Sequence, residues 1–447
     1  MISKLKSYNN TQVYVNESSA NATGTTIELK QLKFEFSRIA IISVHGDPAI
    51  DFGKEEAGGQ NVYVRNIGEE LARLGWVVDM FTRKVSPHQE TIVQHSPNCR
   101  TIRLQAGPLC FVPRDTLFEH ALDFVQNFLN FECQNKILYP IIHSNYWISG
   151  WVGMQLCRIQ GSKQLHTYHS LGCIKYITMG NLPKVAETRL QVEKELLEKT
   201  NCIIATSPEE ALHMRTYVSE KGTIEIIPCG TDIQHFGRTS RSRARQQLNF
   251  NSSDKIVLYV GRFDYRKGIE TLIRAVNISK FRNDSSLKLV IAGGWTEGGA
   301  DGKERERLIQ IVKECNLEGI TNFAGQLGSS NLHLYYAAAD CCVAPSHYEP
   351  FGLVPIEAMA SCTPVVASNV GGLKYTIVHG TTGYLCPPKG DVEFARAIDT
   401  ILSSDELRDT LGKNGAERVS MMFKWQNVCD KLSVQYKKYA EELHDLC

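Results

Sequence analysis

Two glutamates of this sequence, Glu349 and Glu357, stand eight positions apart around a Pro-Phe-Gly turn. The apolar run 340–344 before them predicts a buried parallel strand, and the residues after Gly352 predict a helix. Both acids therefore fall near the carboxyl end of a strand, where open α/β sheets bind ligands. The first-turn amides of the helix suit a phosphate, and the carboxylates suit neutral hydroxyls of a sugar or ribose. A paired-carboxylate hydrolase and a capped helix with solvated acids remain open alternatives.

A second motif, Gly261-Arg-Phe-Asp-Tyr-Arg-Lys-Gly268, also follows a predicted strand and precedes a predicted helix. Arg262 supplies a planar guanidinium and Lys267 a mobile ammonium. The two cations can therefore hold a diphosphate from two sides.

A third motif, Ala57-Gly-Gly-Gln60, follows another predicted strand. Its glycines allow backbone amides to approach a ligand closely, because no Cβ intervenes. Alone, a Gly-Gly pair is usually only a turn. Three such loops at strand ends favour a ligand site.

The elements that must position these loops alternate along the whole chain. Apolar β-branched runs are followed by amphipathic segments, which is typical of βαβ units and parallel sheets. Strands are predicted at 38–44, 77–82, 139–143, 163–168, 202–206, 223–227, 255–260, 287–292, 319–323, 340–344 and 364–368. Helices are predicted in the first half at 60–74, 115–133, 184–199 and 208–219. The pattern breaks at 228–236, and a domain boundary is predicted there.

Length and composition narrow the class of protein. At 447 residues the chain predicts two or three domains. A formal net charge of +1 gives no long-range attraction to nucleic acid or to an acidic membrane. No apolar run is long enough to span a bilayer, and the first 36 residues do not resemble a secretory signal. We therefore expect a cytoplasmic protein without nucleic-acid or membrane partners.

The cysteines and histidines do not predict a metal centre. None of the 14 cysteines forms a Cys-x-x-Cys pair, and Cys202, Cys341 and Cys342 lie in apolar strand patterns. Such cysteines behave as small buried hydrophobes in a reducing compartment. The pair His166 and His169 has no acid or cysteine nearby at ligand spacing, so we expect no metal there.

Together these motifs resemble the retaining, nucleotide-sugar-dependent glycosyltransferases of the GT-B architecture. The resemblance covers residues 37–430 and also rests on Ala358-Met-Ala-Ser361 and on 364–372. Within the family, His169-Ser-Leu-Gly172 followed by Lys175 is similar to the bacterial sucrose-phosphate synthases. Cys362 departs from the glycine that relatives usually carry.

The resemblance implies an α/β fold with two Rossmann-like, doubly wound domains that face each other across a cleft. It implies an N-terminal extension, an acceptor domain, a donor domain and a final helix that crosses back to the first domain, over 1–36, 37–235, 236–422 and 423–447. A plain terminal helix on the second domain is the alternative for the last segment.

The donor site implied by the resemblance uses the second domain. Arg262 and Lys267 would neutralise the departing diphosphate, so that no metal cofactor is obligatory. Glu349 would face the donor sugar and Glu357 the ribose. Gln326, with Leu327, would contact uracil. Backbone amides and contacts across the cleft would come from Phe351, Gly352, Leu353, Gly58, Gly59 and Gln60.

The acceptor site implied by the resemblance uses the first domain. His169 matches the active-site histidine of the family, and Gln60 and Tyr146 are further acceptor candidates. Tyr146 and Trp147 replace a smaller, more polar run in some relatives. Lys175, Arg189 and Arg114 are together candidate cations for a phosphate on the acceptor, although each alone is more typical of a solvated surface charge.

The function implied is retaining transfer of glucose from the co-substrate UDP-glucose to fructose 6-phosphate, which gives sucrose 6-phosphate and UDP. A separate phosphatase would then release sucrose. The alternatives are a sucrose-synthase-like enzyme that uses free fructose, a mannosyl or N-acetylglucosaminyl transferase with an acceptor such as an inositol phosphate or a lipid, and a non-catalytic nucleotide-sugar-binding protein. The four charged residues Arg262, Lys267, Glu349 and Glu357 argue against a non-catalytic role.

Overall fold

The computed structural model describes residues 32–50, 58–114, 116–180 and 182–445. Most of the predicted N-terminal extension, and Ala57 of the third motif, lie outside these residues. The described chain divides into two compact units: an N-terminal unit of 32–50, 58–227 and 428–445, and a C-terminal unit of 228–427.

The N-terminal unit is built on an eight-stranded sheet in the order β3-β4-β2-β1-β5-β6-β7-β8. All neighbouring strands are parallel except β3 and β4, which pair antiparallel at one edge. The strands are β1 (Arg38–Ile42), β2 (Val77–Arg83), β3 (Ile92–Ser96), β4 (Cys99–Leu104), β5 (Ile141–Asn145), β6 (Lys163–Thr167), β7 (Cys202–Ala205) and β8 (Ile224–Ile226).

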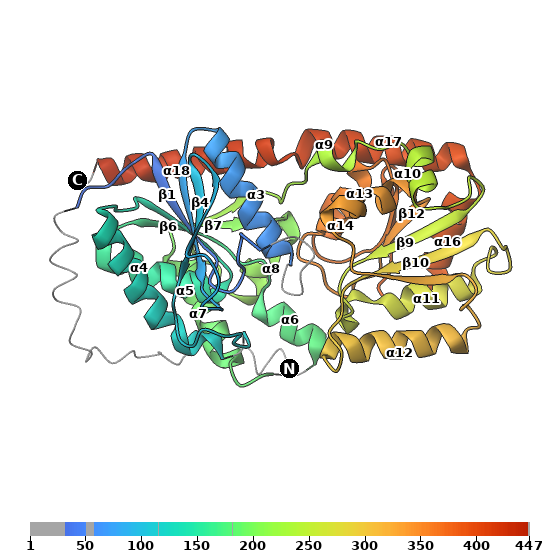
Figure 1. Ribbon diagram of the computed structural model, residues 1–447, viewed down its shortest axis with the longest axis horizontal. Coiled ribbons are helices and arrows are strands. Elements are labelled where there is room, and N and C mark those ends of the chain that lie inside the picture. Colours follow the sequence, from blue (N-terminus) through green and yellow to red (C-terminus); the bar gives the residue numbers. More distant parts are fainter. Residues whose placement is uncertain (1–31, 51–57, 115, 181, 446–447) are drawn as a thin grey trace. The chain divides into compact units, whose positions relative to one another are not determined.

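Helices cover both faces of this sheet (Figure 1). They include α3 (Gly59–Arg73), α4 (Ala121–Asn135), α5 (Trp147–Gln160), α6 (Gly172–Met179), α7 (Ala186–Lys199) and α8 (Pro208–Tyr217), with a 3₁₀ turn at Leu117–His120. The aromatic residues of the predicted helix 115–133 belong to the core: Phe124 and Phe128 are fully buried, and Phe118 and Phe131 pack against them. They therefore do not form an exposed aromatic face for a lipid.

The C-terminal unit has a six-stranded parallel sheet in the order β11-β10-β9-β12-β13-β14. The strands are β9 (Lys255–Val260), β10 (Leu287–Ala292), β11 (Thr321–Gly325), β12 (Cys341–Ala344), β13 (Val365–Ser368) and β14 (Gly383–Cys386). The helices are α9 (Ile233–Phe236), α10 (Arg241–Gln247), α11 (Ile269–Ile278), α12 (Ala300–Glu314), α13 (Ser329–Ala338), α14 (Leu353–Ala360), α15 (Leu373–Thr376), α16 (Asp391–Leu402) and α17 (Asp405–Met422), with a 3₁₀ turn at Tyr265–Lys267.

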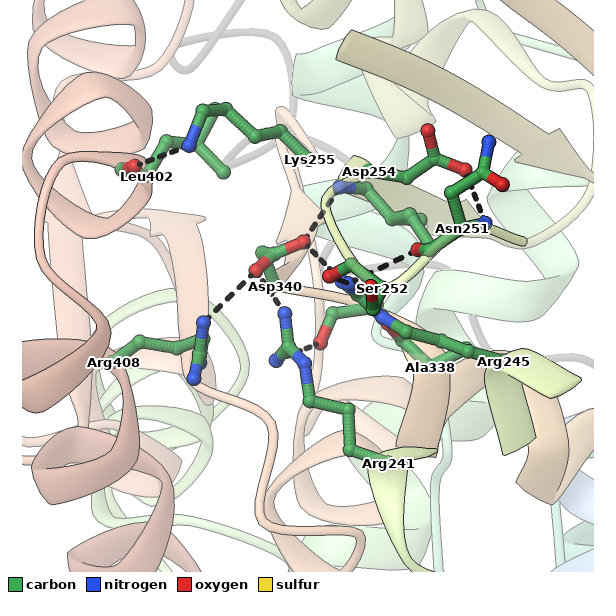
Figure 2. A network of polar contacts seen from close by, with 12 residues as sticks. Arg241, Arg245, Asn251, Ser252, Asp254, Lys255, Ala338, Asp340, Leu402 and Arg408 are labelled. Atoms are coloured by element: carbon green, nitrogen blue, oxygen red, sulfur yellow. Dashed lines mark hydrogen bonds and ion pairs between the residues drawn. The ribbon is translucent and has the colours of Figure 1, made fainter. Parts of the chain in front are cut away.

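Asp340 fixes the amino end of β12 (Figure 2). This buried carboxylate accepts from the amide of Ile256 at 2.6 Å and from Arg245 Nη2 at 2.7 Å. It also pairs with Arg241, which shares α10 with Arg245, and with Arg408 of α17 at 3.3 Å. Because β12 carries the Glu349 loop at its other end, this cluster helps to hold the strand that presents that loop.

The last helix, α18 (Trp425–His444), returns to the N-terminal unit, as the resemblance implied. The hydroxyl of the buried Tyr436 lies 2.6 Å from Nδ1 of His143 on β5. The indole of Trp76 donates to Ser433 at 2.9 Å. None of the helices in the described part of the chain combines the length and apolarity that crossing a membrane requires.

Candidate active site

Three strands of the C-terminal unit present predicted donor residues at one edge of the sheet. Because β9, β10, β11 and β12 are parallel and adjacent, their carboxyl ends form a row. Gln326 follows β11, Arg262 follows β9, and Glu349 lies on the loop after β12. This row brings together residues that are separated by nearly ninety positions in the sequence.

Lys267 and Glu349 form an ion pair, with Nζ 2.5 Å from Oε2. Their side chains are 30% and 17% exposed, so the pair remains accessible to solvent. Arg262 is exposed on the same loop as Lys267. Although burial opposes it, hydrogen bonds from Arg266 lower the pKa of Asp264 to about 2, which keeps this loop's own acid ionised. The loop therefore presents cations that can bind a ligand. The ionised Asp264 stabilises the structure of the same loop.

Two glycines allow these loops to come together. Gly268 has φ +66°, and a Cβ there would lie 2.0 Å from the carbonyl oxygen of Pro345. Gly371 has φ +47°, and a Cβ there would lie 2.1 Å from the carbonyl oxygen of Glu349. The same carbonyl accepts from the amide of Gly372 at 3.0 Å. Larger residues at Gly268 or Gly371 would push the Lys267 and Glu349 loops away from their neighbours.

Glu357 lies half-buried on α14 and accepts a hydrogen bond from the Tyr336 hydroxyl at 2.8 Å. Burial raises the pKa of Glu357 to about 7, and the bond from Tyr336 opposes part of that rise. The carboxyl group therefore changes charge near neutral pH, which is unusual for a glutamate.

The remaining predicted donor residues frame this edge. Gly352 caps α14 with φ +101°, and Leu353 is the first residue of that helix. The first-turn N–H groups of a helix have no partners within the helix, so they can serve an anion. Phe351 is buried against Phe423, with ring centroids 5.7 Å apart. Gln326 is exposed and Leu327 is half-buried after β11.

His169 follows β6 at the carboxyl edge of the N-terminal sheet. Its Nε2 lies 2.9 Å from Oδ1 of the buried Asn145. Since Asn145 Nδ2 donates to the carbonyls of Ile42 and His143, Oδ1 is the acceptor and His169 carries its proton on Nε2. Burial, with a smaller contribution from His143, lowers the pKa of His169 to about 3. The imidazole is therefore neutral, and Nδ1 is the ring nitrogen that can accept a hydrogen bond.

The glycine-rich turn before α3 lies at the same edge. Gly58 caps the helix, and its amide donates to Asn61 Oδ1 at 3.1 Å. Gly59 begins α3, and Gln60 donates to Ser43 Oγ at 2.9 Å and to the carbonyl of Asn145 at 3.3 Å. Gln60 is thus joined to the residue that orients His169.

Arg189 is not a solvated surface charge, since only 1% of it is exposed. Its Nε lies 2.7 Å from Glu193 Oε1, its Nη1 donates to the Tyr146 hydroxyl at 3.1 Å, and its Nη2 donates to the carbonyl of Ser170 at 2.6 Å. Burial works against the charge, yet Glu193 and the nearby phenols hold the pKa of Arg189 above its ordinary value. Arg189 therefore remains a cation that is held in a fixed position inside the N-terminal unit.

The other two predicted acceptor cations lie near this pair. Lys175 is half-buried on α6, and its charge acts on Glu193. Arg114 is exposed, and its charge, like that of Arg189, acts on His45. The charges of all three cations therefore act on buried groups of the N-terminal unit.

Two candidate site residues were not predicted from the sequence. His45 lies three positions after the end of β1, and its ring centroid lies 4.5 Å from that of Tyr146. Its Nδ1 is buried without a hydrogen-bond partner among the described residues, and burial with nearby cations lowers its pKa well below the ordinary value. Asn145 is the second. His45 directly follows the predicted strand 38–44, and Asn145 lies two positions after the predicted strand 139–143, so their place at strand ends was the signal that could have found them.

No three His, Cys, Asp or Glu side chains of the described ranges lie close enough together to hold a metal ion. His166 is fully buried, and its Nδ1 lies 2.9 Å from Ser144 Oγ.

Two family models match the chain: glycosyl transferases group 1 over residues 240–418 and glycosyltransferase family 4 over residues 57–235. The D-inositol 3-phosphate glycosyltransferase of Corynebacterium kroppenstedtii is 33% identical over 408 residues, which cover 90% of this chain and 89% of that protein. The chain therefore belongs to the group 1 glycosyltransferases, and its two parallel-sheet units are those of the GT-B fold.

Two solved structures extend this placement. The sucrose-phosphate synthase of Thermosynechococcus elongatus is 49% identical, with 90% of this chain and 98% of that chain covered and a TM-score of 0.83. HepE of Anabaena, in a complex with UDP and glucose, covers 90% of this chain and 99% of that chain at 20% identity and a TM-score of 0.71, which shows a common fold. The resemblance predicted from the motifs is confirmed, while the names of the relatives differ in the acceptor.

Proposed function

We propose that this glycosyltransferase transfers glucose from UDP-glucose to fructose 6-phosphate with retention of configuration, giving sucrose 6-phosphate and UDP. The similarity to a sucrose-phosphate synthase at 49% identity over 90% of the chain is the observation that carries this proposal. The cations around Arg189 support a phosphorylated acceptor rather than free fructose.

In the proposed reaction, the acceptor hydroxyl attacks the anomeric carbon from the face that the diphosphate leaves. The new bond joins the acceptor oxygen to that carbon, the bond to the phosphate oxygen breaks, and this oxygen takes the acceptor's proton. Arg262 and Lys267 stabilise the charge that develops on the leaving group. Glu349 now neutralises Lys267, and the diphosphate would share that cation when the donor binds.

The acceptor side of the reaction is assigned to the N-terminal unit. The neutral His169, oriented by Asn145, accepts hydrogen bonds from sugar hydroxyls through Nδ1. A covalent intermediate on Glu349 is not part of this route, because the ion pair with Lys267 and the leaving-group proton acceptor make a protein nucleophile unnecessary.

One experiment tests the donor and acceptor together. The purified protein is incubated with UDP-glucose, ADP-glucose, GDP-mannose or UDP-N-acetylglucosamine, and with fructose 6-phosphate, fructose or inositol 3-phosphate. Mass spectrometry and NMR then give the product and its anomeric configuration. We expect sucrose 6-phosphate from UDP-glucose and fructose 6-phosphate. Equal turnover of free fructose would instead indicate a sucrose-synthase-like enzyme.

A second candidate is a glycosyltransferase with inositol 3-phosphate as acceptor. The 33% identity to a D-inositol 3-phosphate glycosyltransferase favours it, and the same cations would serve its phosphate. Product formation with inositol 3-phosphate and none with fructose 6-phosphate would select this alternative.

A further inference from the structure

Trp295 differs from the other tryptophans of the chain. The sequence has five, and Trp76, Trp147, Trp151 and Trp425 are between 2% and 7% exposed. Trp295 is 42% exposed. A large aromatic ring left open to water in a ligand-binding edge is a typical element of a binding surface.

A cation packs against the ring of Trp295. Trp295 lies in the loop after β10, and the guanidinium of Arg305 on α12 lies 3.9 Å from its ring centroid. The same guanidinium lies 5.5 Å from the ring of Phe323 on β11. Arg305 therefore supports the indole against the adjoining strand, which favours a fixed platform over a freely rotating side chain.

Gln326 lies beside this platform. A Cβ at Gly294, the residue before Trp295, would lie 3.2 Å from Cδ and Oε1 of Gln326. A Cβ at Gly325 would lie 3.9 Å from Cζ3 of Trp295. Glycines at both positions thus allow the indole and the amide to approach each other. An amide offers both a donor and an acceptor, which matches the imide edge of uracil.

The platform is one strand away from the diphosphate cations. β10, which carries Trp295, pairs with β9, which carries Arg262, and the amide of Gly261 donates to the carbonyl of Ala292 at 2.9 Å. Neighbouring strands lie about 4.8 Å apart. Along the sheet edge, the order is therefore aromatic platform, cations and then the Glu349 loop, which is the order of base, diphosphate and sugar in a nucleotide sugar.

We infer that Trp295, supported by Arg305, is the surface on which the base of the donor nucleotide stacks, with Gln326 reading the edge of that base. This assignment rests on the proposed nucleotide-sugar donor and adds the residue that holds its base. Stacking supplies affinity for any planar base, and Gln326 supplies the preference for uracil.

The test compares ligands with and without a base by titration calorimetry. In Trp295→Ala, UDP affinity should fall about 5- to 100-fold, the range for loss of one base–aromatic stack. Binding of inorganic pyrophosphate, which has no base, should be unchanged, and Trp295→Phe should keep most of the UDP affinity. Tyr217→Ala is the matched control, since Tyr217 is 40% exposed in the N-terminal unit.

A second readout uses the exposure of this one indole. Acrylamide should quench the fluorescence of Trp295 preferentially, and UDP should protect it. In Trp295→Phe, the UDP-dependent change should disappear while calorimetric binding of UDP persists. Unchanged UDP affinity in Trp295→Ala, or equal losses for UDP and pyrophosphate, would overturn the stacking assignment alone. A wild-type protein that binds pyrophosphate but not UDP would overturn the proposed donor as well.

Discussion

At the candidate acceptor site of the N-terminal unit, Asn145, Tyr146 and Arg189 are buried and bonded within the protein, although Arg114 there is exposed. The charged residues of the candidate donor site in the C-terminal unit are half-buried or exposed. Arg189 and Asn145 are at most 1% exposed, and each has several protein partners. In contrast, Arg262 and Gln326 are exposed, and Lys267 has Glu349 as a solvent-accessible partner.

The two edges also differ in backbone conformation. At the acceptor edge, two residues with side chains have positive φ: His169 at +59° and Tyr146 at +74°. At the donor edge, glycines such as Gly268 and Gly371 have positive φ, and Lys389 after β14 does as well. Non-glycine residues in this region are strained, and such strain persists where the surroundings fix it. Two candidate acceptor residues are thus held in strained backbone conformations, whereas the donor loops turn mainly at glycines.

The largest effect is expected from Arg189→Ala. Removing this cation leaves Glu193 buried without its partner and should lower the free energy of unfolding by about 3–5 kcal/mol. The KM for the phosphorylated acceptor should also rise strongly, while the KM for the donor should not change. Chemical denaturation and steady-state kinetics measure the two effects.

The double variant Arg189→Ala/Glu193→Gln separates these roles. It removes the buried charge and should recover part of the stability, but the acceptor KM should remain high. Recovery of the acceptor KM as well would mean that Arg189 only supports the fold.

Lys267→Ala should lower kcat by about 10²–10³-fold, the usual cost of losing one group that stabilises transition-state charge. Its effect on unfolding should be small, because the pair with Glu349 is partly exposed. Lys267→Arg, which keeps a cation, should retain more activity. Equal kcat in the wild type and in Lys267→Ala would remove the donor edge from the chemistry.

The affinity for UDP-glucose should depend on pH through Glu357. Its pKa is raised to about 7, so the carboxylate that we propose as the acceptor for ribose hydroxyls forms as the pH rises through 7. We expect up to about tenfold tighter binding between about pH 6 and pH 8, absent in Glu357→Gln. The stability contributed by the protonated form runs oppositely: it is complete below about pH 4 and is lost as the pH rises through 7.

The smallest effect is expected from Cys362→Gly. Cys362 has φ +58° after α14, a conformation that glycine adopts without strain. The substitution should raise the free energy of unfolding by no more than about 1 kcal/mol, since the gain in the unfolded chain offsets part of the relief. A marked loss of stability would show that the thiol contributes to packing.

The sequence predicted the parallel strands well because their residues are continuously apolar. The predicted strands 255–260 and 287–292 have the bounds of β9 and β10. In contrast, β3 was missed because this edge strand is largely exposed, with the pattern Ile92-Val-Gln-His-Ser96. β4 was missed because it carries Arg100 and Arg103, whose charges are neutralised by Asp79 and Asp47 from elsewhere in the chain.

The sequence predicted the loops that carry the candidate site residues. It did not predict the side chains with which those residues form hydrogen bonds and ion pairs. Glu193 stands four positions after Arg189 on one helix, a spacing that allows an ion pair, yet burial of that pair depends on packing across the sheet. The bond between His169 and Asn145 joins two strand ends that only the sheet order makes neighbours. Long-range contacts of this kind have no local signal in the sequence.

The most direct test of the account is a crystal structure of the protein soaked with UDP. The account predicts that the diphosphate lies within hydrogen-bonding distance of Arg262 and Lys267, at the carboxyl edge of the C-terminal sheet. A UDP molecule bound away from both cations would contradict it.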